Sequence, residues 1–235
     1  MRGWITMIWL MIPIGLAYHW FSPEGAVARR NDVVSRQWDA AREAVQAAAE
    51  VGEGGERERL LAEARSKYEE ALGLLPKSEE SVIPRQQIAL EKALVVIRQG
   101  FIEEGLHELE GLMEAIQSGE WPEGFEDNFR AAAASGAYQA ATEMRMRGYT
   151  REEWVPAADD ARQQYCLLTD KYDEADTATA RILKQNLEES VRLVRMDLAR
   201  MESDPLPDPP GPTRMRRPGA SGKEAFMKSP SAPGH

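Results

Sequence analysis

The chain has 235 residues, with 39 acidic and 29 basic side chains and a formal net charge of −10. Residues 1–28 carry no net charge and residues 203–235 carry +2, which leaves −12 for residues 29–202. A body this acidic repels nucleic acid, so we expect no DNA or RNA partner. The single cysteine excludes an intramolecular disulfide and a thiolate metal cluster.

The first segment of the chain, residues 3–21, contains no formally charged side chain. As a helix it would measure about 28 Å, close to the hydrocarbon thickness of a bilayer. Aromatic side chains at both ends suit the two headgroup levels, and a proline is tolerated within a membrane helix. The segment therefore predicts a transmembrane signal-anchor that contacts membrane lipid through Trp4, Trp9, Pro13, Tyr18, Trp20 and Phe21.

Two alternatives to a retained anchor stay open. The first is a cleaved signal peptide, because residues 26–28 form a small-x-small cleavage site and would place the cut after Ala28. The second is a hydrophobic hairpin buried within the protein. Cleavage would remove the membrane attachment, whereas a hairpin would leave the segment in contact with the body.

The orientation of the anchor follows from the charges on its two sides. The short amino-terminal tail, with Arg2, favours an exported body, whereas Arg29, Arg30 and Arg36 favour the opposite under the positive-inside rule. Arginine is three times as common as lysine and alanine is abundant, a usage typical of GC-rich bacterial genomes. We expect the bacterial inner membrane with a periplasmic body, and a cytoplasmic body is the alternative.

After a linker over residues 22–31, the chain reads as one all-α domain over residues 32–202. Apolar residues recur at helical spacing, and glycines or prolines separate the runs. We expect stacked antiparallel helical hairpins. The pattern predicts seven helices, at about 33–50, 57–75, 84–100, 102–116, 126–147, 150–169 and 174–201.

Several local signals refine this prediction. The inward-facing apolar line of the third helix ends at Phe101. Thr150 and Glu153 form a capping box that opens the sixth helix, and Pro156 predicts a kink or a restart shortly after it. The fifth helix is rich in alanine and glycine, which predicts close packing at the centre. The last helix carries a coiled-coil-like seam, expected to pack within the chain, at Leu187, Val191, Val194, Leu198 and Met201.

The second predicted helix resembles the second helix of a tetratricopeptide repeat. Ala64, Tyr68, Ala71 and Pro76 stand at relative positions 0, 4, 7 and 12, where that family has a small residue, an aromatic, a small residue and a terminating proline. Residues 100–109 resemble the turn and second helix of another unit, and residues 148–153 resemble residues 100–104.

The resemblance covers residues 32–169 and departs from the family in its period. Gly100 and Gly148 are 48 residues apart, and Ala64 and Gly105 are 41 apart, against a family period of about 34. An irregular helical bundle is therefore the alternative. The resemblance implies a scaffold whose stacked hairpins bind a partner's peptide or helix, as membrane-tethered bacterial proteins of this kind do in envelope assemblies.

No catalytic, cofactor-binding or metal-binding motif is present in the sequence. His107 lacks a second histidine four residues later, and Cys166 stands in an apolar stretch that predicts a buried side chain. The acidic residues between Asp170 and Asp176 suit the start of a helix. We therefore expect no enzyme activity and no cofactor.

Two tryptophans are the candidate interaction residues of the predicted body. Trp121 lies in a loop between helices, and Trp154 follows the capping box. An exposed aromatic side chain is a common anchor for a protein partner. The alternative for each is a tryptophan packed over a junction between helices.

The segment from Ser203 onward differs from the body. It holds eight of the 14 prolines and predicts an extended, disordered tail. Arg214, Arg216 and Arg217 form a basic cluster in it, which is a further candidate for contact with an acidic partner, with lipid headgroups or with the acidic body.

Together these patterns predict a noncatalytic, membrane-anchored interaction scaffold for a bacterial envelope complex. The alternative is an accessory subunit that tethers a catalytic chain to the membrane.

Overall fold

The computed structural model describes residues 23–122, 124–172 and 178–195, with side chains described from Val27 onward. Within these ranges it contains seven α-helices and no strand, so the predicted all-α class is confirmed for this part of the chain. The elements are α2 (Pro23–Glu50), α3 (Gly55–Leu74), the short 3-10 helix η1 (Glu79–Ser81), α4 (Val82–Arg98), α5 (Ile102–Ser118), α6 (Phe125–Met146), α7 (Arg151–Tyr172) and α8 (Ala178–Arg195).

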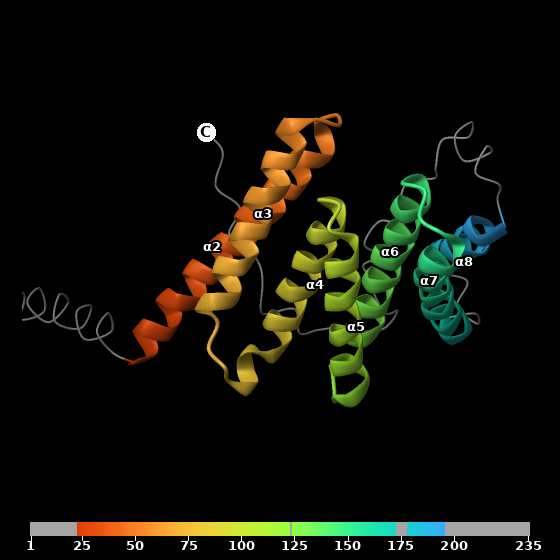
Figure 1. Cartoon of the computed structure of the whole chain (residues 1–235). Coiled ribbons are helices and arrows are strands. Elements are labelled where there is room, and N and C mark those ends of the chain that lie inside the picture. The colour runs from red at the N-terminus through yellow and green to blue at the C-terminus, as the bar shows by residue number, and fades with distance from the viewer. Residues whose placement is uncertain (1–22, 123, 173–177, 196–235) are drawn as a thin grey trace, which may run out of the picture.

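The helices pack as successive antiparallel pairs in a row (Figure 1). α2 packs against α3, α4 against α5, and α6 against α7, and α8 then covers α7. Neighbouring pairs are joined by contacts of α3 with α4, of α5 with α6, and of α4 with α6. Each helix thereby buries its apolar face against its sequence neighbours, as in an array of stacked hairpins.

The connections between helices gather at two edges of this row (Figure 1). We call one the N-terminal edge: it holds the start of α2, the connection from α3 to α4 and the connection from α5 to α6. We call the other the turn edge: it holds the turns after α2, α4 and α6.

Two glycines allow the central helices to approach closely. A Cβ atom on Gly105 of α5 would lie 2.5 Å from Cγ1 of Ile97 and 3.0 Å from the backbone oxygen of Ala93. A Cβ atom on Gly136 of α6 would lie 2.4 Å from Cδ2 of Leu94. The alanine-rich α6 buries small side chains along its length, which brings its backbone close to α4, α5 and α7.

Two helix boundaries differ from those predicted. α2 begins at Pro23, so the segment expected as a linker is helical from that residue on. A proline suits the first turn of a helix because its missing N–H is one of the unpaired donors there. Pro156 lies inside a continuous α7, so the predicted restart is wrong.

The residues that carry the tetratricopeptide resemblance share one buried face of α3. Ala64, Tyr68 and Ala71 are all buried, and the helix ends at Leu74, two residues before Pro76. Small side chains on this face let α3 lie close to α2, with which it forms a common core.

The buried seam of α8 differs from the predicted one. Leu183, Asn186, Ser190 and Leu193 are buried, whereas Leu187, Val191 and Val194 are half-buried on the neighbouring stripe. The prediction was based on apolar side chains alone, so it missed Asn186 and Ser190, the polar residues of the buried seam. Leu198 and Met201 lie outside the described residues.

Among the described residues, no helix is both long and apolar enough to cross a membrane. The predicted anchor, with Trp4, Trp9, Pro13, Tyr18, Trp20 and Phe21, lies outside these residues, as do Arg214, Arg216 and Arg217 of the tail.

Candidate interaction surface

Trp154 lies in the core at the junction of α6, α7 and α8. Its side chain is 4% exposed, and it packs in the largest apolar cluster of the described residues. The guanidinium carbons of Arg145 and Arg151 lie 4.9 Å and 5.7 Å from its ring centroid. Burial removes Trp154 from the candidate interaction residues and agrees with the packing alternative.

The two arginines beside Trp154 also hold the end of α8. Arg145 donates a hydrogen bond to the backbone oxygen of Leu193, and Arg151 donates one to that of Val194 over 3.5 Å. The last carbonyl groups of a helix lack backbone partners and carry a partial negative charge, so cationic donors stabilise them. Trp154 thus belongs to a structural joint between three helices.

Trp121 closes the connection between α5 and α6. Its indole nitrogen donates to the backbone oxygen of Ile116 over 2.7 Å, and its ring stacks on Phe125 with centroids 5.2 Å apart. The side chain is half-buried. These contacts order the loop and account for the burial of part of the ring.

A polar joint connects the first three helices at Glu91 of α4. One of its carboxylate oxygens accepts hydrogen bonds from Nε1 of Trp38 (2.8 Å) and from the hydroxyl of Tyr68 (3.0 Å). Arg42 of α2 donates to both carboxylate oxygens, over 2.9 Å and 2.5 Å. Burial, followed by the charge of Glu91, raises the pKa of Tyr68 above its usual range. The joint fixes α2 and α3 against α4.

A second polar joint connects α6 and α7 at the buried carboxylate of Asp127. Nζ of Lys171 lies 2.7 Å and 2.8 Å from its two oxygens, and the hydroxyl of Tyr172 donates to it over 2.7 Å. Burial, with the hydrogen bond to Asp127, raises the pKa of Tyr172 to about 12. A buried carboxylate with charged and neutral donors is fully satisfied, which suits a structural role.

The turns after α4 and α6 have the same hydrogen-bond pattern. In the first, the N–H groups of residues 99, 100 and 101 donate to the backbone oxygens of residues 95, 97 and 96. In the second, those of residues 147, 148 and 149 donate to residues 143, 145 and 144. Gly100 and Gly148 have φ of 91° and 80°, the left-handed conformation that ends a helix in this motif. The turn is therefore repeated at an interval of 48 residues.

The repeated turns present exposed apolar side chains on the turn edge. Phe101 is 55% exposed and Met146 is 49% exposed. The guanidinium of Arg65 lies over the Phe101 ring, 5.7 Å from its centroid, and Arg147 beside Met146 donates to the backbone oxygen of Gly100. We define the candidate interaction surface as Phe101, Met146, Arg65 and Arg147.

The sequence did not reveal this surface. Phe101 continues the apolar spacing of α4, so it was predicted to face inward. In the structure Gly100 turns the chain in the left-handed conformation, and the Phe101 side chain leaves the line of α4. The glycine before it was the available signal, because a helix does not extend its face through a left-handed residue.

The side chains that could bind a metal ion lie apart from one another in the described part of the chain. No group of three or more His, Cys, Asp or Glu side chains is placed to hold a metal ion within the described ranges. His107 is exposed, with Nδ1 4.0 Å from Oε2 of Glu110. Cys166 is half-exposed rather than buried, because it lies on the outer side of α7, 4.0 Å from Asp170.

Comparison with known proteins gave no relative. No family model matches this chain, and no curated protein or solved structure matches it.

Proposed function

We propose that this protein is a noncatalytic scaffold that binds a protein partner through the turn edge of its helical array. The repeated turn carries this proposal. Two hairpins end their first helices with the same hydrogen bonds, and each turn leaves one large apolar side chain, Phe101 or Met146, in solvent. Exposed aromatic and methionine side chains beside arginines have the composition found at the centres of protein interfaces.

The resemblance to tetratricopeptide repeats supports the same proposal. The buried face at Ala64, Tyr68 and Ala71 and the close approach at Gly105 have the packing that the resemblance implies. Arrays of this type use their surfaces for binding rather than for chemistry. The long interval between the repeated turns makes this chain a divergent member at most.

We further propose that residues 3–21 anchor this scaffold in the bacterial inner membrane, with the helical body in the periplasm. The uncharged length and the aromatic residues at its ends support the anchor. α2 starts two residues after this segment, so the anchor and the body are joined without a long spacer.

Substitution on the turn edge tests the scaffold proposal. The double variant Phe101→Ser with Met146→Ser is compared with Leu167→Ser, which removes a similarly exposed apolar side chain from α7. The mass of the complex that contains the chain is measured on native gels of detergent-solubilised membranes. We expect the double variant to lose the complex and Leu167→Ser to keep it, with both variants retaining the wild-type helix content and melting temperature.

Two results would contradict the proposal. One is a wild-type chain that migrates at the mass of the chain alone, and the other is a double variant that keeps the complex. A catalytic chain within the complex would support the alternative of an accessory tethering subunit.

Topology and processing test the anchor. A reporter that is active on only one side of the membrane is fused after His235, and the amino terminus of the mature chain is sequenced. An uncleaved chain with a reporter active in the periplasm is expected. Cleavage after Ala28 would exclude the anchor, and a reporter active in the cytoplasm would reverse the orientation.

A further inference from the structure

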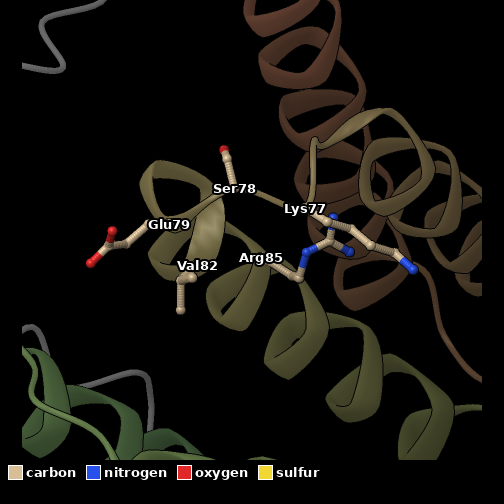
Figure 2. A pocket seen from close by; sticks show the side chains of 5 residues that line it. All are labelled: Lys77, Ser78, Glu79, Val82 and Arg85. Carbon is tan, nitrogen blue, oxygen red and sulfur yellow. The ribbon is translucent and has the colours of Figure 1, made fainter.

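The side chains around the hollow at the connection from α3 to α4 do not converge on a ligand position. The hollow measures about 400 Å³ and is lined by Lys77, Ser78, Glu79, Val82 and Arg85 (Figure 2). Lys77 and Glu79 point in opposite directions, and Arg85 donates to two backbone oxygens at the end of α3, over 2.7 Å and 3.3 Å. The flank of α8, in contrast, presents apolar and charged side chains in a regular order.

α8 carries two stripes of residues side by side. The first is the seam against α6 and α7, with Leu183, Asn186, Ser190 and Leu193 buried. The second, about 90° around the helix from the first, consists of the half-buried residues Leu187, Val191 and Val194. Val191, in the middle of the second stripe, packs against none of the buried clusters of the described residues. The chain itself therefore covers the second stripe only in part.

The second stripe has the spacing of a coiled coil. Its residues are four and three positions apart, and the sequence continues the same alternation at Leu198 and Met201. Such a spacing lets two helices pack their apolar side chains along a common seam. Because the first stripe already holds α8 against α7, the helix is ordered before it meets a second helix.

Charges of alternating sign border the second stripe. Arg181, Glu188 and Arg195 are seven residues apart, and all three are exposed. Glu188 and Arg195 come directly after Leu187 and Val194, so they lie beside the stripe. None of the three charged side chains forms an ion pair with another residue of the described ranges. Their charges are therefore available to another helix.

These charges favour one arrangement of two α8 helices. When a second copy of α8 lies antiparallel, with Val191 beside Val194 of that copy, Glu188 faces Arg195 of the second copy and Arg195 faces its Glu188. A shift by one heptad in either direction brings Glu188 against Glu188 or Arg195 against Arg195, and like charges repel. The favoured arrangement is symmetric, as the interface of a two-fold dimer must be.

A parallel pair lacks this complementarity. Glu188 would then face position 183 of the other helix, and Arg195 would face position 190. Leu183 and Ser190 are both 0% exposed, so neither is accessible to a second copy. The charges beside the stripe would have no partners.

We infer that this chain forms a dimer through an antiparallel pair of α8 helices, with Leu187, Val191 and Val194 at the seam and Glu188 paired with Arg195 of the second copy. The inference goes beyond the proposed function, because it assigns a second copy of the chain to a surface separate from the turn edge.

The pair is compatible with the proposed anchor. The two-fold axis of an antiparallel pair is perpendicular to its helices. When this axis is the membrane normal, both copies can insert residues 3–21 into one bilayer, and α8 then lies along the membrane. The pairing itself does not require the anchor.

Reversal of charge on α8 tests the pair. The full-length chain is purified in detergent, and sedimentation measures its mass over a range of concentrations. We expect the wild-type chain to dimerise, and Glu188→Arg or Arg195→Glu to weaken the dimer about tenfold, because each places like charges at both pairs. Arg192→Glu is the control, because the exposed Arg192 lies on the side of α8 away from the second stripe, where its charge acts on Tyr138 of α6. We expect the control to leave the dimer unchanged.

A mixture of the two single variants isolates the proposed contact. A chain with Glu188→Arg and a chain with Arg195→Glu have opposite charges at both pairs only when one of each associates. We therefore expect the mixture to recover wild-type dimerisation, with copurification of differently tagged chains as the readout. A chain that carries both substitutions should recover it as well.

Four results would overturn the inference. They are a monomeric wild-type chain, a dimer that neither charge reversal weakens, a dimer that Arg192→Glu weakens equally, and a mixture that does not recover. A dimer insensitive to these charges would be held by another surface, such as residues 3–21. Phe101→Ser with Met146→Ser should leave the α8 pair intact, so the inference and the proposed function can fail separately.

Discussion

Arg147, in the turn after α6, donates a hydrogen bond from Nη1 to the backbone oxygen of Gly100, in the turn after α4, over 3.1 Å. The guanidinium fills the space that a Cβ atom on Gly100 would occupy, since Nη2 would lie 2.6 Å from that atom. The two equivalent turns are therefore in direct contact, and the contact crosses from one hairpin to the next. Arg147 and the residue after Gly100, Phe101, both belong to the candidate interaction surface.

Replacing Arg147 by alanine should weaken the joint between these hairpins. We expect the free energy of unfolding to fall by about 0.5–1.5 kcal/mol, as for the loss of one hydrogen bond. Arg162→Ala is the control, because Arg162 pairs with Asp159 within α7 and should change stability by less than about 0.5 kcal/mol. Urea unfolding followed by circular dichroism measures both. Equal effects of the two substitutions would show that the contact contributes nothing.

Replacing either of two glycines of α5 by alanine should change the free energy of unfolding, but in opposite directions. A Cβ atom on Gly105 meets side-chain and backbone atoms of α4, whereas one on Gly111 would meet no described atom within 4 Å apart from its own helix backbone. We expect Gly105→Ala to lower the free energy of unfolding by about 1–3 kcal/mol, because α4 and α5 must separate. Gly111→Ala should raise it by about 0.5–1 kcal/mol through helix propensity. Thermal and urea unfolding of the two variants provide the comparison, and stabilisation by Gly105→Ala would disprove the close approach.

The joint at Glu91 should be the most sensitive polar site of the first three helices. Glu91→Ala leaves Trp38, Arg42 and Tyr68 without their acceptor, and we expect a loss of about 2–4 kcal/mol in the free energy of unfolding. The control is Glu110→Ala, which removes an exposed carboxylate from the outer side of α5. We expect it to change the free energy of unfolding by less than about 0.5 kcal/mol. Tryptophan fluorescence of the folded variants would report the loss of the Trp38 hydrogen bond. An unchanged unfolding midpoint for Glu91→Ala would contradict the structure.

Tyr172 should make the folded protein sensitive to alkaline pH. Its pKa is raised to about 12 in the folded state, mainly by burial and then by Asp127, and it returns to about 10 in the unfolded chain. Because the folded pKa is the higher one, the contribution of this group is complete below about pH 10 and is lost as the pH rises through about 12.

The pKa of Tyr172 is measured by NMR of the ring carbons. Asp127→Asn keeps an acceptor but removes the charge, so it should lower the pKa part of the way towards its usual value. Thr169→Ser, on the same helix, leaves Asp127 in place and should leave the titration of Tyr172 unchanged. A pKa near 10 in the wild-type protein would show that the Asp127 joint is open in solution.

The number of helices and most of their boundaries followed from the sequence, because periodic apolar residues and intervening glycines or prolines are local signals. The capping box is an example: the N–H of Thr150 donates to the Glu153 carboxylate over 2.7 Å, as predicted. Such features depend on residues three or four positions apart, which a single chain displays directly.

The errors arose where the environment of a side chain depends on distant helices. Trp154 is buried in a cluster that includes Leu193 near the end of α8, about 40 residues later in the chain. Asn186 and Ser190 lie in the buried seam of α8, where composition alone favours Leu187 and Val191. Phe101 is exposed because of one left-handed glycine before it. None of these placements follows from apolar spacing within one helix.

The number of helices in the described body has a geometric consequence. The seven helices α2 to α8 alternate in direction. Because their number is odd, a chain that runs through all of them ends on the side opposite the one where it began. The chain enters at the N-terminal edge, and the arginines beside Trp154 hold the end of α8 at the turn edge. A helix such as α3, with 20 residues, is about 30 Å long. The body thus places Pro23 and residue 195 on opposite sides, separated by about that length.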